Sequence, residues 1–116
     1  AIERLEDGPL PLVRAGGFPI RAAVFIDNEA SSRYTVVEVN ARDRAALLSG
    51  LARAVFDARA AIHSAHVATY GERAVDVFYV TDLQGEKIAS AAKLKSLRER
   101  LLKAAAGAEP ARSAAA

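Results

Sequence analysis

Alternating apolar and polar positions predict four β-strands in this chain. β-Branched and aromatic residues gather in short runs with the period of two that a half-buried strand shows. These runs are RAAVFID (21–27), YTVVEVN (34–40), AIHSAHVATY (61–70) and RAVDVFYVTD (73–82). In the second run, Val37 and Val39 share one face, and Val36 and Glu38 share the other.

The connections between these runs predict two hairpins. The polar segment between the first two runs is short enough to join antiparallel neighbours. Between the last two runs only Gly71 and Glu72 remain, and glycine supplies the positive φ that begins a type II′ turn.

Two further segments have the period of an amphipathic helix. The first spans about 44–59, and Asp43 is its predicted N-cap, since a carboxylate accepts from the free amides of a first turn. Its apolar stripe contains Leu47, Leu48, Leu51, Val55 and Ala58, and its outward positions are Ser49, Arg53 and Asp57. The second helix spans about 90–106, with Gly107 as its stop signal. Its stripe contains Leu94, Leu97, Leu101 and Ala104.

The order of elements is therefore β-β-α-β-β-α. A ferredoxin-like βαββαβ sheet places its last strand beside its first, and here an extra leading strand takes that edge instead. The pattern predicts an α+β fold, a permuted ferredoxin-like sandwich with a four-stranded antiparallel sheet and two helices on one face.

Composition indicates a single small domain with irregular ends. A chain of 116 residues is too short for two domains. Residues 1–20 hold three of the four prolines and read as a linker, 21–106 as the domain, and the Ala-rich 107–116 as a disordered tail.

Charge and residue usage argue against several functional classes. A net charge of +2 is too small to indicate nucleic acid, and the fourth strand lacks the glycine and first aromatic of an RNA-binding strand. No apolar run approaches the roughly 20 residues of a membrane span. The absence of cysteine suits a reducing compartment, so we expect a cytoplasmic protein.

Candidate catalytic and metal-binding residues are few. His63 and His66 form an H-x-x-H pair, but on a regular strand they point to opposite faces, and only a bulge would bring them together. We therefore expect no metal site. Asp76 lies in a strand among apolar residues, where a solvent-side position is favoured over a general base. No nucleotidyl-transfer, hydrolase or phosphate-loop motif is present, so we expect no catalysis by this chain.

The corner NARDRAALL, residues 40–48, is the strongest candidate binding site. A helix N-terminus offers free amides and a partial positive charge to a carboxylate, and Asn40, Arg42 and Arg44 add polar groups beside it. The alternative is that Asp43 itself occupies the amides and the arginines are solvated. The residues alone leave both interpretations open.

Three strings then point to a known family. DNEAS, IHSAH and YGERAVDVFYVTD closely resemble the C-terminal ACT domain of the bifunctional uridylyltransferase/uridylyl-removing enzymes, which modify the PII nitrogen-regulatory protein. The resemblance runs from about residue 25 to 102. It implies a regulatory domain that senses glutamine. It also implies that catalysis, with Mg²⁺ as the expected metal, belongs to other domains of a parent enzyme, and that this fragment holds no cofactor.

The same resemblance implies where the ligand binds. ACT domains typically hold an amino acid between two copies, so the expected partners are glutamine, another ACT domain and the catalytic domains of the parent. The implied ligand-binding residues are Asn40, Arg42, Asp43, Arg44, Ala45, Ala46, Leu47 and Leu48 at the corner, and Ile62, His63 and Ser64, followed by Ala65 and His66, on the partner-facing strand.

One departure from the family pattern opens an alternative function. The pattern D-R-P-G-L-L reads D-R-A-A-L-L here, so Ala45 replaces proline and Ala46 replaces glycine. A methyl group at Ala46 narrows the space for a ligand. The alternative is a structural or dimerisation module that binds no ligand.

Overall fold

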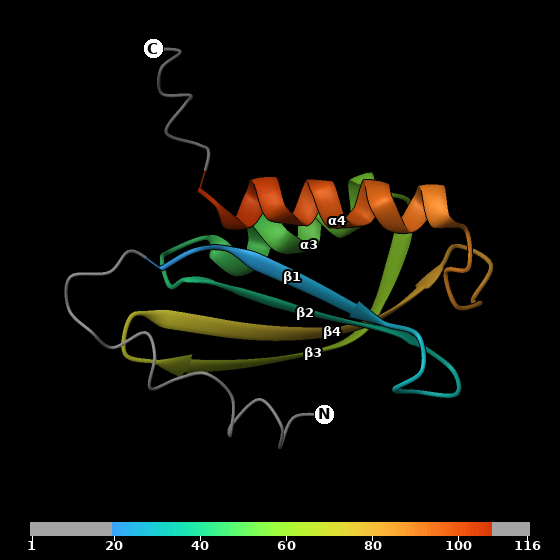
Figure 1. Cartoon of the computed structure of the whole chain (residues 1–116), viewed down its shortest axis with the longest axis horizontal. Helices are drawn as coiled ribbons and strands as arrows, with labels where there is room; N and C mark the ends of the chain where they lie inside the picture. The colour runs from blue at the N-terminus through green and yellow to red at the C-terminus, as the bar shows by residue number, and fades with distance from the viewer. Residues whose placement is uncertain (1–19, 108–116) are drawn as a thin grey trace, which may run out of the picture.

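The computed structural model describes residues 20–107, which form six elements (Figure 1). In chain order these are β1 (Ala23–Asp27), β2 (Thr35–Arg42), α3 (Leu47–Asp57), β3 (Ala60–Tyr70), β4 (Arg73–Asp82) and α4 (Ala91–Ala105). The predicted linker over 1–20 and tail over 107–116 fall almost entirely outside the described residues. Neither of the two described helices combines the length and the apolar character that crossing a bilayer requires.

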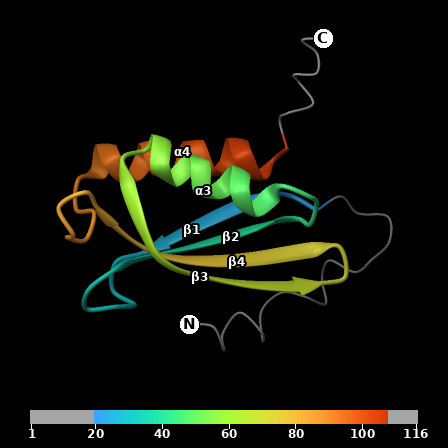
Figure 2. The same ribbon diagram turned by 180° about the vertical axis from the view of Figure 1, so that it is seen from behind.

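The four strands form one antiparallel sheet in the order β1-β2-β4-β3. The leading strand β1 occupies a sheet edge and pairs with β2 alone, as the permuted topology predicts. Both helices cover the same face of the sheet, which is clear in the opposed views of Figures 1 and 2. The predicted α+β sandwich is therefore confirmed.

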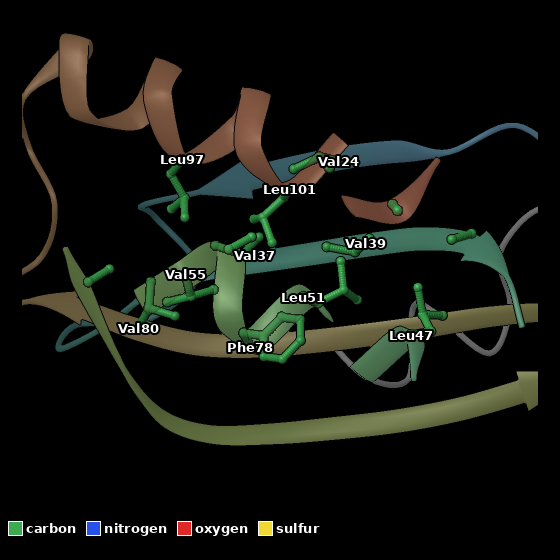
Figure 3. Close-up of a cluster of buried hydrophobic side chains, with 14 of the residues drawn as sticks. Val24, Val37, Val39, Leu47, Leu51, Val55, Phe78, Val80, Leu97 and Leu101 are labelled. Carbon is green, nitrogen blue, oxygen red and sulfur yellow. The ribbon is translucent and has the colours of Figure 1, made fainter. Parts of the chain in front are cut away.

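The main core lies between the sheet and the helix layer (Figure 3). Leu51 and Val55 of α3 and Leu97 and Leu101 of α4 are at most 1% exposed and pack against strand residues such as Phe78. The leucine periodicity thus identifies the buried face of each helix. Leu48 departs from the predicted stripe, because it is 45% exposed beside the helix start.

A smaller apolar cluster lies on the opposite face of the sheet. Val36, Val75 and Val77 are buried there, with Tyr70 and Tyr79 packed around them. These residues alternate with the main-core residues along β2 and β4, so both faces of the two central strands are apolar.

Helix α3 begins three residues later than the sequence predicts. Its N-cap is Ala46, with a left-handed φ of 68°, and no side chain caps the first turn. The prediction that Asp43 is the N-cap is therefore wrong. The backbone amide of Asp43 instead donates to the carbonyl of Glu72 at 2.7 Å, which holds Asp43 at the end of the sheet, before the helix can start.

The turn between β3 and β4 has the predicted form. Gly71 has a φ of 62°, whereas Glu72 is not among the residues with positive φ, which fits a type II′ turn and excludes type I′. Tyr70 pairs directly with Arg73 across it.

The left-handed conformation of Ala46 leads to a stability prediction. Because an L-residue with a Cβ is disfavoured at this φ, Ala46→Gly is expected to raise the free energy of unfolding by about 1 kcal/mol. Urea denaturation measures this. The matched control is Ala45→Gly, whose φ is not positive and which should lose about 0.5 kcal/mol through added freedom of the unfolded chain. Equal losses for both variants would contradict the assignment of strain to Ala46.

Candidate functional site

A cavity of about 340 Å³ lies at the corner that joins the sheet to α3. Its walls come from the segment before the helix, the first turn of the helix and the facing sides of β3 and β4. The lining residues are Asp43, Arg44, Ala46, Leu47, Leu48, Ser49, Val67, Ala74 and Asp76. Five of the predicted ligand-binding residues therefore line one cavity of a single chain.

The start of α3 gives one wall of this cavity an electropositive character. The first amides of a helix have no partner within the helix, and no side chain caps them here. Together with the helix dipole, these amides form a site suited to a carboxylate. Ala46 lies on this wall, so its methyl group borders the space that a ligand would fill.

Asp76 contributes a buried carboxyl group on the opposite wall. It is 2% exposed, so the prediction of a solvent-side position is wrong. Asp76 alternates in phase with Ala74, Phe78 and Val80, whose side chains lie in the main core, and this phase turns it toward the helix layer. Its Oδ1 atom is buried without a hydrogen-bond partner among the described residues.

The surroundings of Asp76 change its acidity. Burial, and to a smaller extent the negative charge of Asp43, raises the pKa of the Asp76 carboxyl from 3.8 to about 6. Two carboxyl groups thus line one cavity, and the charge of Asp43 disfavours ionisation of Asp76, so this part of the cavity is suited to a cation.

The two arginines of the corner already have partners. Arg42 donates to Glu72 at 2.6 Å, in an exposed ion pair that joins the end of β2 to the turn between β3 and β4. Arg44 donates at 2.7 Å to the carbonyl of Ala104 near the end of α4, which places a cation at a helix C-terminus. Arg44 lines the cavity as well, whereas Arg42 does not.

Asn40 lies on the far side of the sheet from the cavity. It alternates with Val37 and Val39 of the main core and shares the opposite face with Val36. Its side-chain amide donates to Glu38 at 2.9 Å, and its oxygen accepts from Arg73 at 2.8 Å. The structure therefore does not bring Asn40 to the other predicted corner residues. Ala45 lies next to these residues in the chain and is exposed.

Strand β3 contains a bulge at His63. Ile62 pairs with Val80 and Ser64 with Tyr79, so His63 is one residue extra to the ladder. His63 lies 2.8 Å from the hydroxyl oxygen of Thr81, with its ring beside that of Tyr34, and the ring of His66 meets the edge of Tyr79.

The bulge thus turns both histidines toward the face away from the helices. Among residues 20–107 there is no group of three or more His, Cys, Asp or Glu side chains placed to hold a metal ion. The predicted partner-facing residues Ile62, His63 and Ser64 are exposed and lie outside the cavity of their own chain, whereas Val67 of the same strand lines it.

Two other hollows lack the chemistry of this corner. One of about 840 Å³, between the β1–β2 loop and the start of α4, is polar, and the N-cap of that helix is occupied by Ser90, whose hydroxyl accepts from the amide of Lys93. One of about 430 Å³ lies between α3 and α4, where the exposed charged side chains Arg53, Asp57 and Lys103 surround small residues such as Ala54 and Ala104. The corner cavity is preferred because it combines an uncapped helix start with a buried, unpartnered carboxyl group.

The fold is the ferredoxin-like sandwich expected of an ACT domain. The sequence model of the family described as "ACR family N-terminal ACT domain" matches residues 30–107, so the chain belongs to this ACT family. No solved structure matches the chain.

Curated relatives agree with this placement. The chain is 58% identical over 104 residues to the bifunctional uridylyltransferase/uridylyl-removing enzyme of Novosphingobium aromaticivorans, 51% identical over 110 residues to that of Erythrobacter litoralis, and 59% identical over 92 residues to that of Zymomonas mobilis. These alignments cover 90%, 95% and 79% of the chain but only 11%, 12% and 10% of the relatives. The chain therefore spans about a tenth of the length of these enzymes.

Proposed function

We propose that this chain is the glutamine-sensing ACT domain of a bifunctional enzyme that attaches UMP to the PII protein and removes it again. The relatives support the proposed identity of the parent enzyme, because they are named bifunctional uridylyltransferase/uridylyl-removing enzymes and align with nearly the whole chain. The cavity beside α3 supports ligand binding, and it is the observation that carries this part of the proposal. The position as the last ACT domain of the parent rests on the sequence resemblance.

In this proposal, the chain itself is regulatory and the chemistry takes place in other domains of a cytoplasmic parent, where Mg²⁺ serves the transfer reaction. The described residues offer no cluster of metal ligands. The effect of glutamine on the parent then depends on contacts between this domain, another ACT domain and the catalytic domains.

Glutamine is a good chemical match to the cavity. The uncapped first turn of α3 suits its α-carboxylate, and the apolar side chains of Leu48 and Val67 suit its methylene groups. The two carboxyl groups, Asp43 and Asp76, disfavour a ligand with an acidic side chain. This arrangement favours glutamine over glutamate.

The direct test is calorimetric titration of glutamine and of glutamate into the chain. We expect glutamine to bind with a Kd of about 1 mM or tighter, and glutamate at least roughly tenfold more weakly. Ala46→Gly, which removes the methyl group from the cavity wall, is expected to tighten binding. Absence of heat up to about 10 mM glutamine would overturn glutamine sensing by this domain.

The alternative is a pairing module without a ligand, and one observation favours it. β3 is an edge strand of 11 residues that is exposed along most of its length, and it includes the predicted partner-facing residues. An exposed strand edge offers unpaired amides and carbonyls to a second sheet. Sedimentation should then show self-association of the chain, in both the presence and the absence of glutamine.

A further inference from the structure

Asp76 places a carboxyl group in the interior of the fold without full hydrogen bonding among the described residues. Oδ1 is buried without a hydrogen-bond partner among the described residues, and buried acceptors in native proteins are nearly always paired. Leaving such a group unpaired costs stability, and more so when it carries a charge. A group beyond the residues that the structure describes is therefore the missing partner.

No element around Asp76 supplies that partner. Its neighbours across the sheet are Val39 of β2 and Val67 of β3, which are apolar. From the segment before α3, Asp43 brings a like charge, and the guanidinium of Arg44 is already bonded to the carbonyl of Ala104 on α4. The first turn of α3 brings Leu47, Leu48 and Ser49 to the cavity, none of them charged.

The cavity therefore has two poles of opposite sign. At one pole, Asp76 and Asp43 are suited to a cation, and at the other the uncapped amides of α3 are suited to an anion. Both poles belong to a cavity of about 340 Å³, so one small zwitterion can reach both. An α-amino acid carries the two charges on the same carbon atom.

We propose that Asp76 is a ligand-binding residue that accepts the ammonium group of an α-amino acid, while the first turn of α3 holds its carboxylate. This inference rests on the proposed ligand-binding function and names the group that recognises the ligand. Asn40, the other polar candidate of the corner, is not available for this role, because its side-chain amide is engaged on the other face of the sheet.

Asp76 also makes the site selective for the class of ligand. A ligand without an ammonium group leaves the carboxyl of Asp76 desolvated and unpaired, so it gains little from entering the cavity. Glutaramic acid is a suitable probe, because it keeps the carboxylate and carboxamide of glutamine and lacks only the ammonium group.

The experiment compares glutamine with glutaramic acid by calorimetry, on the chain and on Asp76→Asn. We expect the unaltered chain to bind glutamine at least tenfold more tightly than glutaramic acid. Asp76→Asn, which keeps the size of the side chain and removes its charge, should lose that preference by binding glutamine at least tenfold more weakly. The matched control Asp57→Asn, at the other end of α3, should bind both compounds as the unaltered chain does.

A second measurement follows the Asp76 carboxyl itself. An ammonium group at Asp76 stabilises its charged form, so saturation with the ligand should lower the pKa of this carboxyl, as read from its ¹³C resonance. A group that served only the fold would titrate alike with and without the ligand.

The outcomes separate this inference from the proposed function. If the chain and Asp76→Asn bind glutamine equally, with the same preference over glutaramic acid, the role of Asp76 is overturned and glutamine sensing stands. If glutamine does not bind but another of the twenty amino acids does, and Asp76→Asn weakens it, the role stands and the glutamine assignment falls. If no amino acid binds or shifts the Asp76 resonance, both are overturned.

Discussion

Asp76→Asn is expected to stabilise the folded chain at pH 8 by up to about 3 kcal/mol. Burial raises the pKa of Asp76 from 3.8 to about 6 in the folded protein, and each pH unit of that difference corresponds to about 1.36 kcal/mol. The variant has no charge to bury, so it avoids the cost of ionising this group inside the cavity.

The direction of the pKa shift of Asp76 determines the pH range in which this stabilisation should be seen. Between pH 3.8 and 6 the unfolded chain has released the Asp76 proton while the folded chain still holds it, so the contribution of Asp76 to stability falls as the pH rises. Urea denaturation at pH 4 and pH 8 should show the advantage of Asp76→Asn only at the higher pH. Asp57→Asn is the control. An equal effect at both pH values would mean that Asp76 ionises in the folded protein as it does in the unfolded one.

Thr35→Val is expected to destabilise the chain by about 3 kcal/mol. The Thr35 hydroxyl is fully buried, donates to the side-chain oxygen of Asn28 at 2.6 Å and accepts from the amide of Ile88 at 2.9 Å. Asn28 in turn donates to the carbonyl of Ile88 at 2.9 Å. Valine has the same shape and leaves two groups without a partner, each at a cost of about 1–3 kcal/mol.

Two control variants separate the contribution of the Thr35 hydroxyl group from that of its methyl group. Thr35→Ser keeps the hydroxyl and loses one buried methyl group, so it should cost only about 1 kcal/mol. Thr69→Val, at an exposed position of β3, should change the free energy of unfolding by less than about 0.5 kcal/mol. Thermal or urea unfolding gives all three values. A smaller loss for Thr35→Val than for Thr35→Ser would contradict the role of the hydrogen bonds.

The sequence predicts the fold well because the apolar residues of each helix or strand recur with the period of that element. The run 73–82 coincides with β4, and the leucines of both helices mark their buried faces. The start of α3 was harder to predict, since a carboxylate at Asp43 is a common N-cap and the left-handed residue is an alanine. Only the glycine of the family pattern at Ala46 hinted at a positive φ.

The site was predicted only in part, for a reason that lies in the sheet. Alternation assigns residues to two faces, and it does not say which face the helices cover when both are apolar. Val36 and Val75 are buried on the open face, as Val37 and Phe78 are on the covered one. The position of Asn40 along the chain therefore groups it with the corner, although its side chain lies on the other face of the sheet. The sequence analysis assigns Asp76 to the solvent side, although its phase with Phe78 is a usable signal for burial.

If Asp76 binds the ligand as proposed, stability and ligand binding make opposite demands on this side chain. The substitution that is expected to stabilise the free protein is also the one expected to lose the preference for an ammonium group. Such opposition is common where a binding site holds a group that the free protein leaves unpaired.

The bulge at His63 has a consequence for changes in chain length. Ile62 before the bulge and Ala65 after it pair with Val80 and Phe78, which lie in the same core, although three residues separate them on β3 and two on β4. Without the extra residue, one end of β3 would turn its apolar side chains outward. A deletion of one residue at this point would therefore turn the side chains on one side of the bulge to the wrong face of the sheet, either toward the α3–β3 connection or toward the β3–β4 turn.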